Sequence, residues 1–154
     1  MFFLKELPSR QMIGGYTVGH PQADPEVVLA TLQMMRQASL LIRRLESFFG
    51  EHDLSQLRFL ALIVIDREPE RDSLTASEIA DRLDVSRPVT TRTLQSLTMA
   101  GLVRAETDEQ DGRSRCIALT DRGRGKLAEV LPGYFAILID ASTQAASAGC
   151  GDRL

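Results

Sequence analysis

The side chains best suited to recognition chemistry lie on one predicted helix, which begins at Ser86 and ends near Gly101. Thr90, Leu94 and Leu97 follow helical spacing on an inner arc, so the intervening side chains face outward. The outward set is Ser86, Arg87, Thr91, Arg92 and Gln95. Arginine pairs with guanine or phosphate, glutamine with adenine, and threonine with base edges or a thymine methyl group. This face is therefore suited to the major groove of duplex DNA, whereas a helix of this kind taken alone is more often a solvated surface.

A basic β-hairpin is predicted directly after this helix. Two short apolar-alternating segments, 102–107 and 113–119, are joined by a polar linker that contains Asp111 and Gly112. Arg113 and Arg115 share one face of an extended strand, where they can enter a minor groove or bind phosphates. Asp111 is expected to hold Arg113 through a charge-assisted hydrogen bond. The alternative for either arginine is a solvated side chain without a partner.

The elements before these two features predict a helical scaffold. Residues 1–23 contain no clear period and indicate an irregular arm with at most a short helix. Asp24 and Pro25 then begin a long helix over 24–50. A second helix starts near Ser55 and ends before Pro69, and a third, from Thr75 to Leu83, opens with a capping box.

The junctions between the later elements carry turn and cap signals. Asp84 and Val85 form a tight turn, in which Asp84 can tolerate the left-handed conformation that many such turns place on glycine. A last helix begins at Thr120-Asp121 and is expected to be interrupted at Pro132-Gly133. The order of capped helix, tight turn, two-faced helix and basic hairpin favours a helix-turn-helix with a wing over a merely solvated surface.

Composition limits the functional classes. The 154 residues carry a net charge of -3, but residues 86–126 contain eight basic and five acidic side chains. A local basic surface is sufficient to attract phosphate. Cys116 and Cys150 fit neither a disulfide framework nor a zinc site, and Cys116 is expected in the core. We expect no metal, no cofactor and no catalytic residues, hence no enzyme, and a cytoplasmic protein without a membrane span.

These residues resemble the MarR family of winged helix-turn-helix transcriptional regulators. The positions that carry the resemblance are Ser86-Arg87-Pro88, Thr91-Arg92, Leu94, Leu97, Gly101-Leu102-Val103, Asp111, Arg113 and Leu119-Thr120. The resemblance implies a homodimer on a pseudo-palindromic operator, acting as a repressor that a small aromatic or phenolic ligand releases. It also places Arg113 in the minor groove, steadied by Asp111.

The expected fold is mainly α, with a small antiparallel β wing and long dimerisation helices. Residues 1–154 would form a single domain, with an N-terminal arm at 1–23, dimerisation helices at 24–50 and 121–148, and a winged helix-turn-helix DNA-binding lobe at 55–120. Phe2, Phe3 and Leu4 of the arm are expected to pack across the partner subunit.

Two further expectations concern partners. A ligand pocket is expected where the long helices meet the lobe, with Tyr16, Arg58, Phe59 and Tyr134 as candidate contacts; the alternative is that these aromatic residues are core. The alternative function is a winged-helix module that binds protein instead of DNA, which the outward arginines disfavour.

Overall fold

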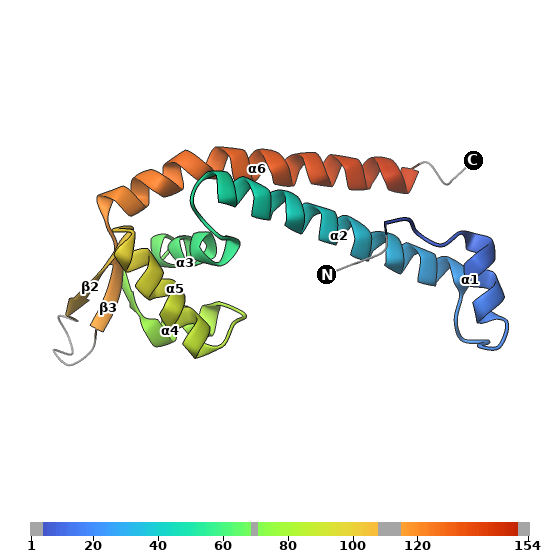
Figure 1. Ribbon diagram of the computed structural model, residues 1–154, viewed down its shortest axis with the longest axis horizontal. Helices are drawn as coiled ribbons and strands as arrows, with labels where there is room; N and C mark the ends of the chain where they lie inside the picture. The colour runs from blue at the N-terminus through green and yellow to red at the C-terminus, as the bar shows by residue number, and fades with distance from the viewer. Residues whose placement is uncertain (1–4, 69–70, 108–114, 151–154) are drawn as a thin grey trace. The chain divides into compact units, whose positions relative to one another are not determined.

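The computed structural model describes residues 5–68, 71–107 and 115–150, with side chains described for all of these except Thr107 and residues 145–150. The chain forms two compact units, one of residues 1–45 and 139–154 and the other of residues 46–138. Figure 1 labels the elements along the chain. Among the described residues, no helix is long and apolar enough to cross a membrane.

The first unit contains α1 (Arg10–Thr17), most of α2 (Pro25–Glu51) and the end of α6 (Asp121–Cys150). Ser9 caps α1 by accepting a hydrogen bond from the Met12 amide at 3.2 Å. The Asp24 carboxylate accepts from the Glu26 amide at 2.8 Å, which confirms the predicted start of the long helix. The short helix α1 lies within the arm that the sequence left without a clear period.

The second unit contains α3 (Gln56–Asp66), α4 (Ala76–Arg82), α5 (Arg87–Met99) and a three-stranded sheet. The core side chains come from each of these elements: Phe59, Leu62, Ile65, Leu74, Ile79, Leu97, Val103 and Leu119 are at most 2% exposed. The first part of α6 adds Leu127 and Val130 to this core. Burial on this scale is the main stabilising contribution to the lobe.

The predicted hairpin is present as β2 (Val103–Thr107) and β3 (Arg115–Leu119), which pair antiparallel from Val103 with Leu119 to Thr107 with Arg115. A third strand, β1 (Ser73–Thr75), pairs with the other edge of β3 and gives the order β1-β3-β2. The sequence analysis predicted no strand between the helix that ends before Pro69 and the helix that begins at Thr75. A three-residue strand has too short a pattern to be recognised without its partner.

One local expectation is wrong, and one tolerated backbone conformation is not used. α6 runs through Pro132 and Gly133 without interruption, because packing of its buried face, which includes Val130 and Ile137, outweighs the one hydrogen bond that proline removes. Asp84 does not adopt the left-handed conformation; among the described non-glycine residues only Asp53 has a positive φ. Instead the Val85 amide donates to the Leu83 carbonyl at 2.8 Å, which closes a three-residue turn around Asp84.

Candidate nucleic-acid interface

The first helix of the helix-turn-helix, α4, is fixed by the capping box that the sequence predicts. The Glu78 amide donates to Thr75 Oγ1 at 3.2 Å, and the Thr75 amide donates to Glu78 Oε2 at 2.8 Å. Arg71 Nη2 donates to the other carboxylate oxygen at 2.7 Å. Hydrogen bonds from Arg71 and then from the Thr75 amide lower the pKa of Glu78 to about 2. Glu78 therefore stays ionised near neutral pH and, through the capping box, stabilises the N-terminus of α4.

The second helix, α5, separates into the two predicted faces. Thr90, Leu94 and Leu97 are buried at 2%, 5% and 0% exposure, and Thr93 lies beside them. Ser86, Arg87, Thr91, Arg92 and Gln95 are all exposed. The five residues that were predicted to face outward are therefore all on the exposed surface of α5.

The basic side chains around α5 divide into paired and unpaired groups. Arg104 donates to Glu106 and to the Leu119 carbonyl, and Lys126 pairs with Glu129 at 3.0 Å. Other side chains of the segment keep their charge for an external partner: Arg92, Arg115 and Arg122 have no hydrogen bond or ion pair with any described residue. Arg87 is intermediate, since its guanidinium lies 3.7 Å from the Asp81 carboxylate and both are mostly exposed.

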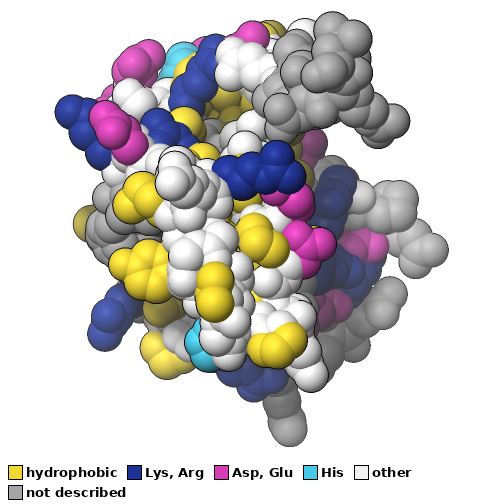
Figure 2. All heavy atoms as spheres, turned by 90° about the vertical axis from the view of Figure 1, so that its right-hand side faces the viewer, with side chains coloured by type: hydrophobic (Ala, Val, Ile, Leu, Met, Phe, Trp, Pro, Cys, Tyr) yellow, Lys and Arg dark blue, Asp and Glu magenta, His cyan; other side chains and the backbone are white. Residues whose placement is uncertain are grey.

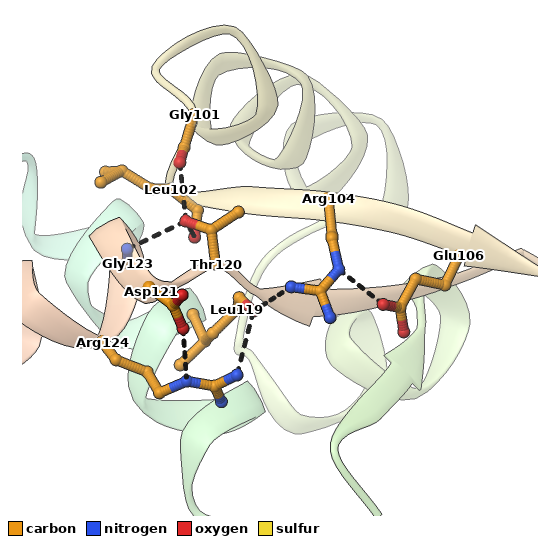
Figure 3. A network of polar contacts seen from close by, with 9 residues as sticks. All are labelled: Gly101, Leu102, Arg104, Glu106, Leu119, Thr120, Asp121, Gly123 and Arg124. Carbon is orange, nitrogen blue, oxygen red and sulfur yellow. Dashed lines mark hydrogen bonds and ion pairs between the residues drawn. The ribbon is translucent and has the colours of Figure 1, made fainter.

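The root of the wing is fastened to α6 by a polar network, which Figure 3 shows from close by. Thr120 Oγ1 donates to the Gly101 carbonyl at 2.7 Å and accepts from the Gly123 amide at 3.0 Å. The Thr120 amide donates to the Leu102 carbonyl at 3.1 Å. One threonine thus joins the end of α5, the start of β2 and the first turn of α6, so the wing has a fixed origin relative to α5.

A hollow of about 500 Å³ lies between α5 and the sheet. Its polar lining consists of Thr91, Thr98 and Gln95 from α5 and Arg115 from β3. Its apolar lining consists of Ala76, Leu94, Met99, Ala105 and Ile117. Thr91 and Gln95 of the predicted recognition helix and Arg115 of the wing therefore line the same hollow.

The predicted wing tip cannot be placed, because Asp111 and Arg113 lie outside the described residues. Arg115, the predicted DNA-binding arginine of the wing that the structure does describe, is exposed at the start of β3. The neighbouring Cys116 is 4% exposed, which confirms its expected place in the core.

Three of the candidate ligand contacts, Arg58, Phe59 and Tyr134, belong to the second unit, and each has a partner or neighbour there. Phe59 is 1% exposed and packs against Tyr134 with ring centroids 4.8 Å apart, so these two rings belong to the aromatic core. Arg58 Nη1 donates to the Asp53 carbonyl at 2.9 Å, just after the C-terminal end of α2, where a cation is favourable. Tyr16 is 82% exposed and belongs to the other compact unit.

Three residues of the interface were missed by the sequence analysis. Asp81 contacts Arg87 from α4, and no short-range pattern predicts that pair because the turn geometry decides it. Val89 and Met99 are apolar but 39% and 89% exposed on α5. Their positions outside the inner arc could have identified them, since a helical wheel places both away from Thr90 and Leu97.

The sequence comparisons agree with this architecture. A family model described as the MarR family matches residues 52–114, which include α3, α4 and α5. The HTH-type transcriptional repressor YetL of Bacillus subtilis is 26% identical over 133 residues, covering 86% of this chain and 78% of YetL.

Solved structures with the same fold include complexes with DNA. Sco3205, a MarR family transcriptional regulator from Streptomyces coelicolor, matches in complex with DNA with a TM-score of 0.69 and 23% identity, covering 86% of this chain and 78% of that one. This likeness establishes the fold. The transcriptional regulator MosR of M. tuberculosis, also in complex with DNA, matches with a TM-score of 0.59 and 28% identity over 74% of this chain and 80% of that one.

Proposed function

Because this chain belongs to the MarR family of winged helix-turn-helix transcriptional regulators, we propose that it is a repressor that binds a pseudo-palindromic operator as a homodimer. In this proposal α5 enters the major groove through Ser86, Arg87, Thr91, Arg92 and Gln95. Arg115 binds a phosphate near the wing. Arg113, steadied by Asp111, enters the minor groove.

The observation that carries the proposal is the exposed face of α5, where Arg92 and Gln95 have no partner among the described residues. An exposed arginine that is already paired contributes little to phosphate attraction, whereas an unpaired one releases counterions when it binds. Gln95 lies one helical turn after Thr91, so both reach the same part of a groove. The protein-binding alternative lacks a comparable apolar surface on α5.

Salt dependence tests the phosphate contacts. Operator duplexes are selected from a random pool, and affinity is measured by fluorescence anisotropy over a range of salt concentrations. Arg92→Ala and Arg115→Ala should each reduce the slope of log K against log salt by about 1.8, since each change occurs twice in a dimer. Lys126→Ala is the matched control, because Glu129 already pairs with that charge at 3.0 Å. Equal slopes in all three variants would refute the assigned surface.

Gln95→Ala tests base reading separately from charge. It should leave the salt slope unchanged and reduce the preference for the selected operator over a scrambled duplex by about 2–6 kcal/mol, the value of one bidentate base contact in each of two half-sites. Retention of the full preference would remove Gln95 from the interface.

The dimer part of the proposal is supported by exposed apolar side chains of the first unit. Figure 2 shows hydrophobic side chains gathered at the end of this unit that carries α1. The large hydrophobic side chains of the whole first unit that are at least 45% exposed, among the residues that the structure describes, are Met12, Tyr16, Val18, Val27, Met34, Met35, Leu40, Ile42 and Ile139. A set of this size on residues 1–45 and 139–154 is typical of a subunit interface, and we propose 24–50 and 121–148 as the dimerisation helices. Met34→Glu combined with Ile42→Glu should give a monomer in sedimentation; an unchanged dimer would contradict this assignment.

Ligand release is the remaining part of the proposal. Tyr16 and Arg58 stay candidates for an aromatic ligand, while the packing of Phe59 against Tyr134 favours a core role for those two rings. Titrating the protein–operator complex with phenol and with benzoate, with cyclohexanol as the non-aromatic control, measures the effect directly. Release by the aromatic compounds alone is the expected result.

A further inference from the structure

We propose that Thr91 reads the operator with its methyl group, and that the base it contacts is a thymine whose C5-methyl group faces α5. This inference rests on the proposed function, since it names the base that one residue of the DNA-binding face recognises. Threonine has two possible modes in a major groove, hydrogen bonding through the hydroxyl and apolar contact through the methyl group. The contacts of Thr91 separate the two modes.

The hydroxyl of Thr91 is already engaged with the helix backbone. Thr91 Oγ1 donates to the Arg87 carbonyl at 3.0 Å. Its proton is therefore not free for guanine O6 and N7, adenine N7 or thymine O4, which all need a donor, and the only hydrogen bond left to this hydroxyl is as an acceptor of an adenine or cytosine amino group. Thr93 and Thr98 donate in the same way to the carbonyls four residues earlier, so the arrangement is a regular property of α5.

The methyl group is the remaining substituent on the Thr91 Cβ, and the hollow beside it has more apolar than polar side chains in its lining, although Gln95, Thr98 and Arg115 also line it. Thr91 lines the hollow between α5 and the sheet together with Leu94, Met99, Ala105 and Ile117. A thymine methyl group that approaches this side chain gives up little hydration and leaves no unpaired donor behind. A cytosine at the same place would bring its amino group toward these apolar side chains, which is less favourable.

The start of α5 contains a second apolar group of the same size. Val89 is 39% exposed, has the shape of threonine and carries no hydroxyl. It lies two residues before Thr91 and therefore on the other flank of the outward face. Two exposed side chains whose methyl groups are available at the start of this helix are consistent with reading by shape and apolar contact there, while Arg92 between them supplies the charge.

The experiment is a double-mutant cycle between protein and DNA with the full-length chain and the selected operator. On the DNA, each thymine is replaced in turn by uracil, which removes the methyl group alone. On the protein, Thr91→Val keeps the shape and both methyl-sized groups, whereas Thr91→Ser keeps the hydroxyl and loses the methyl group. Circular dichroism confirms that both variants fold, and Val89→Ala gives an independent measurement at the second position.

The inference expects one thymine whose change to uracil weakens wild-type binding by about fourfold, the effect of one methyl-sized contact. Thr91→Val should keep that sensitivity and near wild-type affinity, and Thr91→Ser, which removes the methyl group from both subunits, should lose about sixteenfold and become insensitive to uracil. The inference is overturned if Thr91→Ser binds like the wild type, or if Thr91→Val loses more affinity than Thr91→Ser. Failure of the wild type to prefer any duplex would instead refute the proposed function itself.

Discussion

The first turn of α6 contains a glycine that the fold cannot replace. A Cβ built on Gly123 lies 2.1 Å from the Leu102 carbonyl oxygen and 3.3 Å from Leu119 Cδ2. The carbonyl belongs to the backbone and is held in place by the Thr120 amide at 3.1 Å, so no side-chain rotation can relieve the contact. Gly123→Ala must therefore move α6 away from the root of the wing.

The expected loss in the free energy of unfolding follows from the size of that movement. Ordinary contact begins at about 3.4 Å, so α6 and Leu102 must separate by about 1.3 Å. This separation breaks the bonds from the Gly123 amide to Thr120 Oγ1 and from the Thr120 amide to Leu102, about 1 kcal/mol each. Overpacking adds about 1–3 kcal/mol, and the better helix propensity of alanine returns about 1 kcal/mol. The free energy of unfolding should fall by about 2–4 kcal/mol.

Urea unfolding followed by circular dichroism measures this loss, and Gly125→Ala is the matched control. A Cβ on Gly125 meets nothing within 4 Å, so this variant should be more stable than the wild type by up to about 1 kcal/mol. Two glycines in one helix turn should thus change stability in opposite directions. If Gly123→Ala unfolds at the same urea concentration as Gly125→Ala, the close approach of α6 to the wing root is wrong.

Three further changes test other parts of the fold. Glu78→Gln should lower the free energy of unfolding by about 1 kcal/mol near neutral pH; because the folded pKa of Glu78 is about 2 and its ordinary value 4.5, the deficit in urea unfolding should shrink as pH falls from about 4.5 toward 2. In a Cys150→Ser background, Cys116 should react with a thiol reagent only through opening of the fold, more than about tenfold slower than in urea, since it is 4% exposed. Gly133→Ala should cost about 1 kcal/mol in urea unfolding, less than Gly123→Ala, because its Cβ would meet a Phe48 ring carbon at 2.6 Å and a ring can shift.

The parts of the fold that the sequence predicts correctly are those encoded by neighbouring residues. The capping box of Thr75 and Glu78 and the cap at Asp24 depend on residues within one turn, so a linear reading finds them. The inner arc of α5 has a period that Thr90, Leu94 and Leu97 satisfy without any knowledge of what covers them. The exposure of the recognition face follows from the same period.

The parts that were missed depend on residues distant in sequence. The strand β1 exists because Leu74 pairs with Ile117, and a three-residue segment cannot show this alone. The continuity of α6 past Pro132 depends on burial of Val130 and Ile137, which a local rule about proline does not include. The packing of Phe59 against Tyr134 also joins residues distant in sequence, and their aromatic type alone predicts a core as well as a pocket.

The charge of the recognition segment shows why a count of basic residues overstates a binding surface. Residues 86–126 carry a positive excess, yet Arg104 and Lys126 are held by Glu106 and Glu129 and so contribute little to a field outside the protein. The positive charge that can attract DNA comes from basic side chains that have no carboxylate beside them. Arg92 meets that condition because the positions around it on α5 carry no carboxylate. Affinity for phosphate should therefore follow the unpaired arginines of α5 and β3 and be nearly independent of the net charge of the chain.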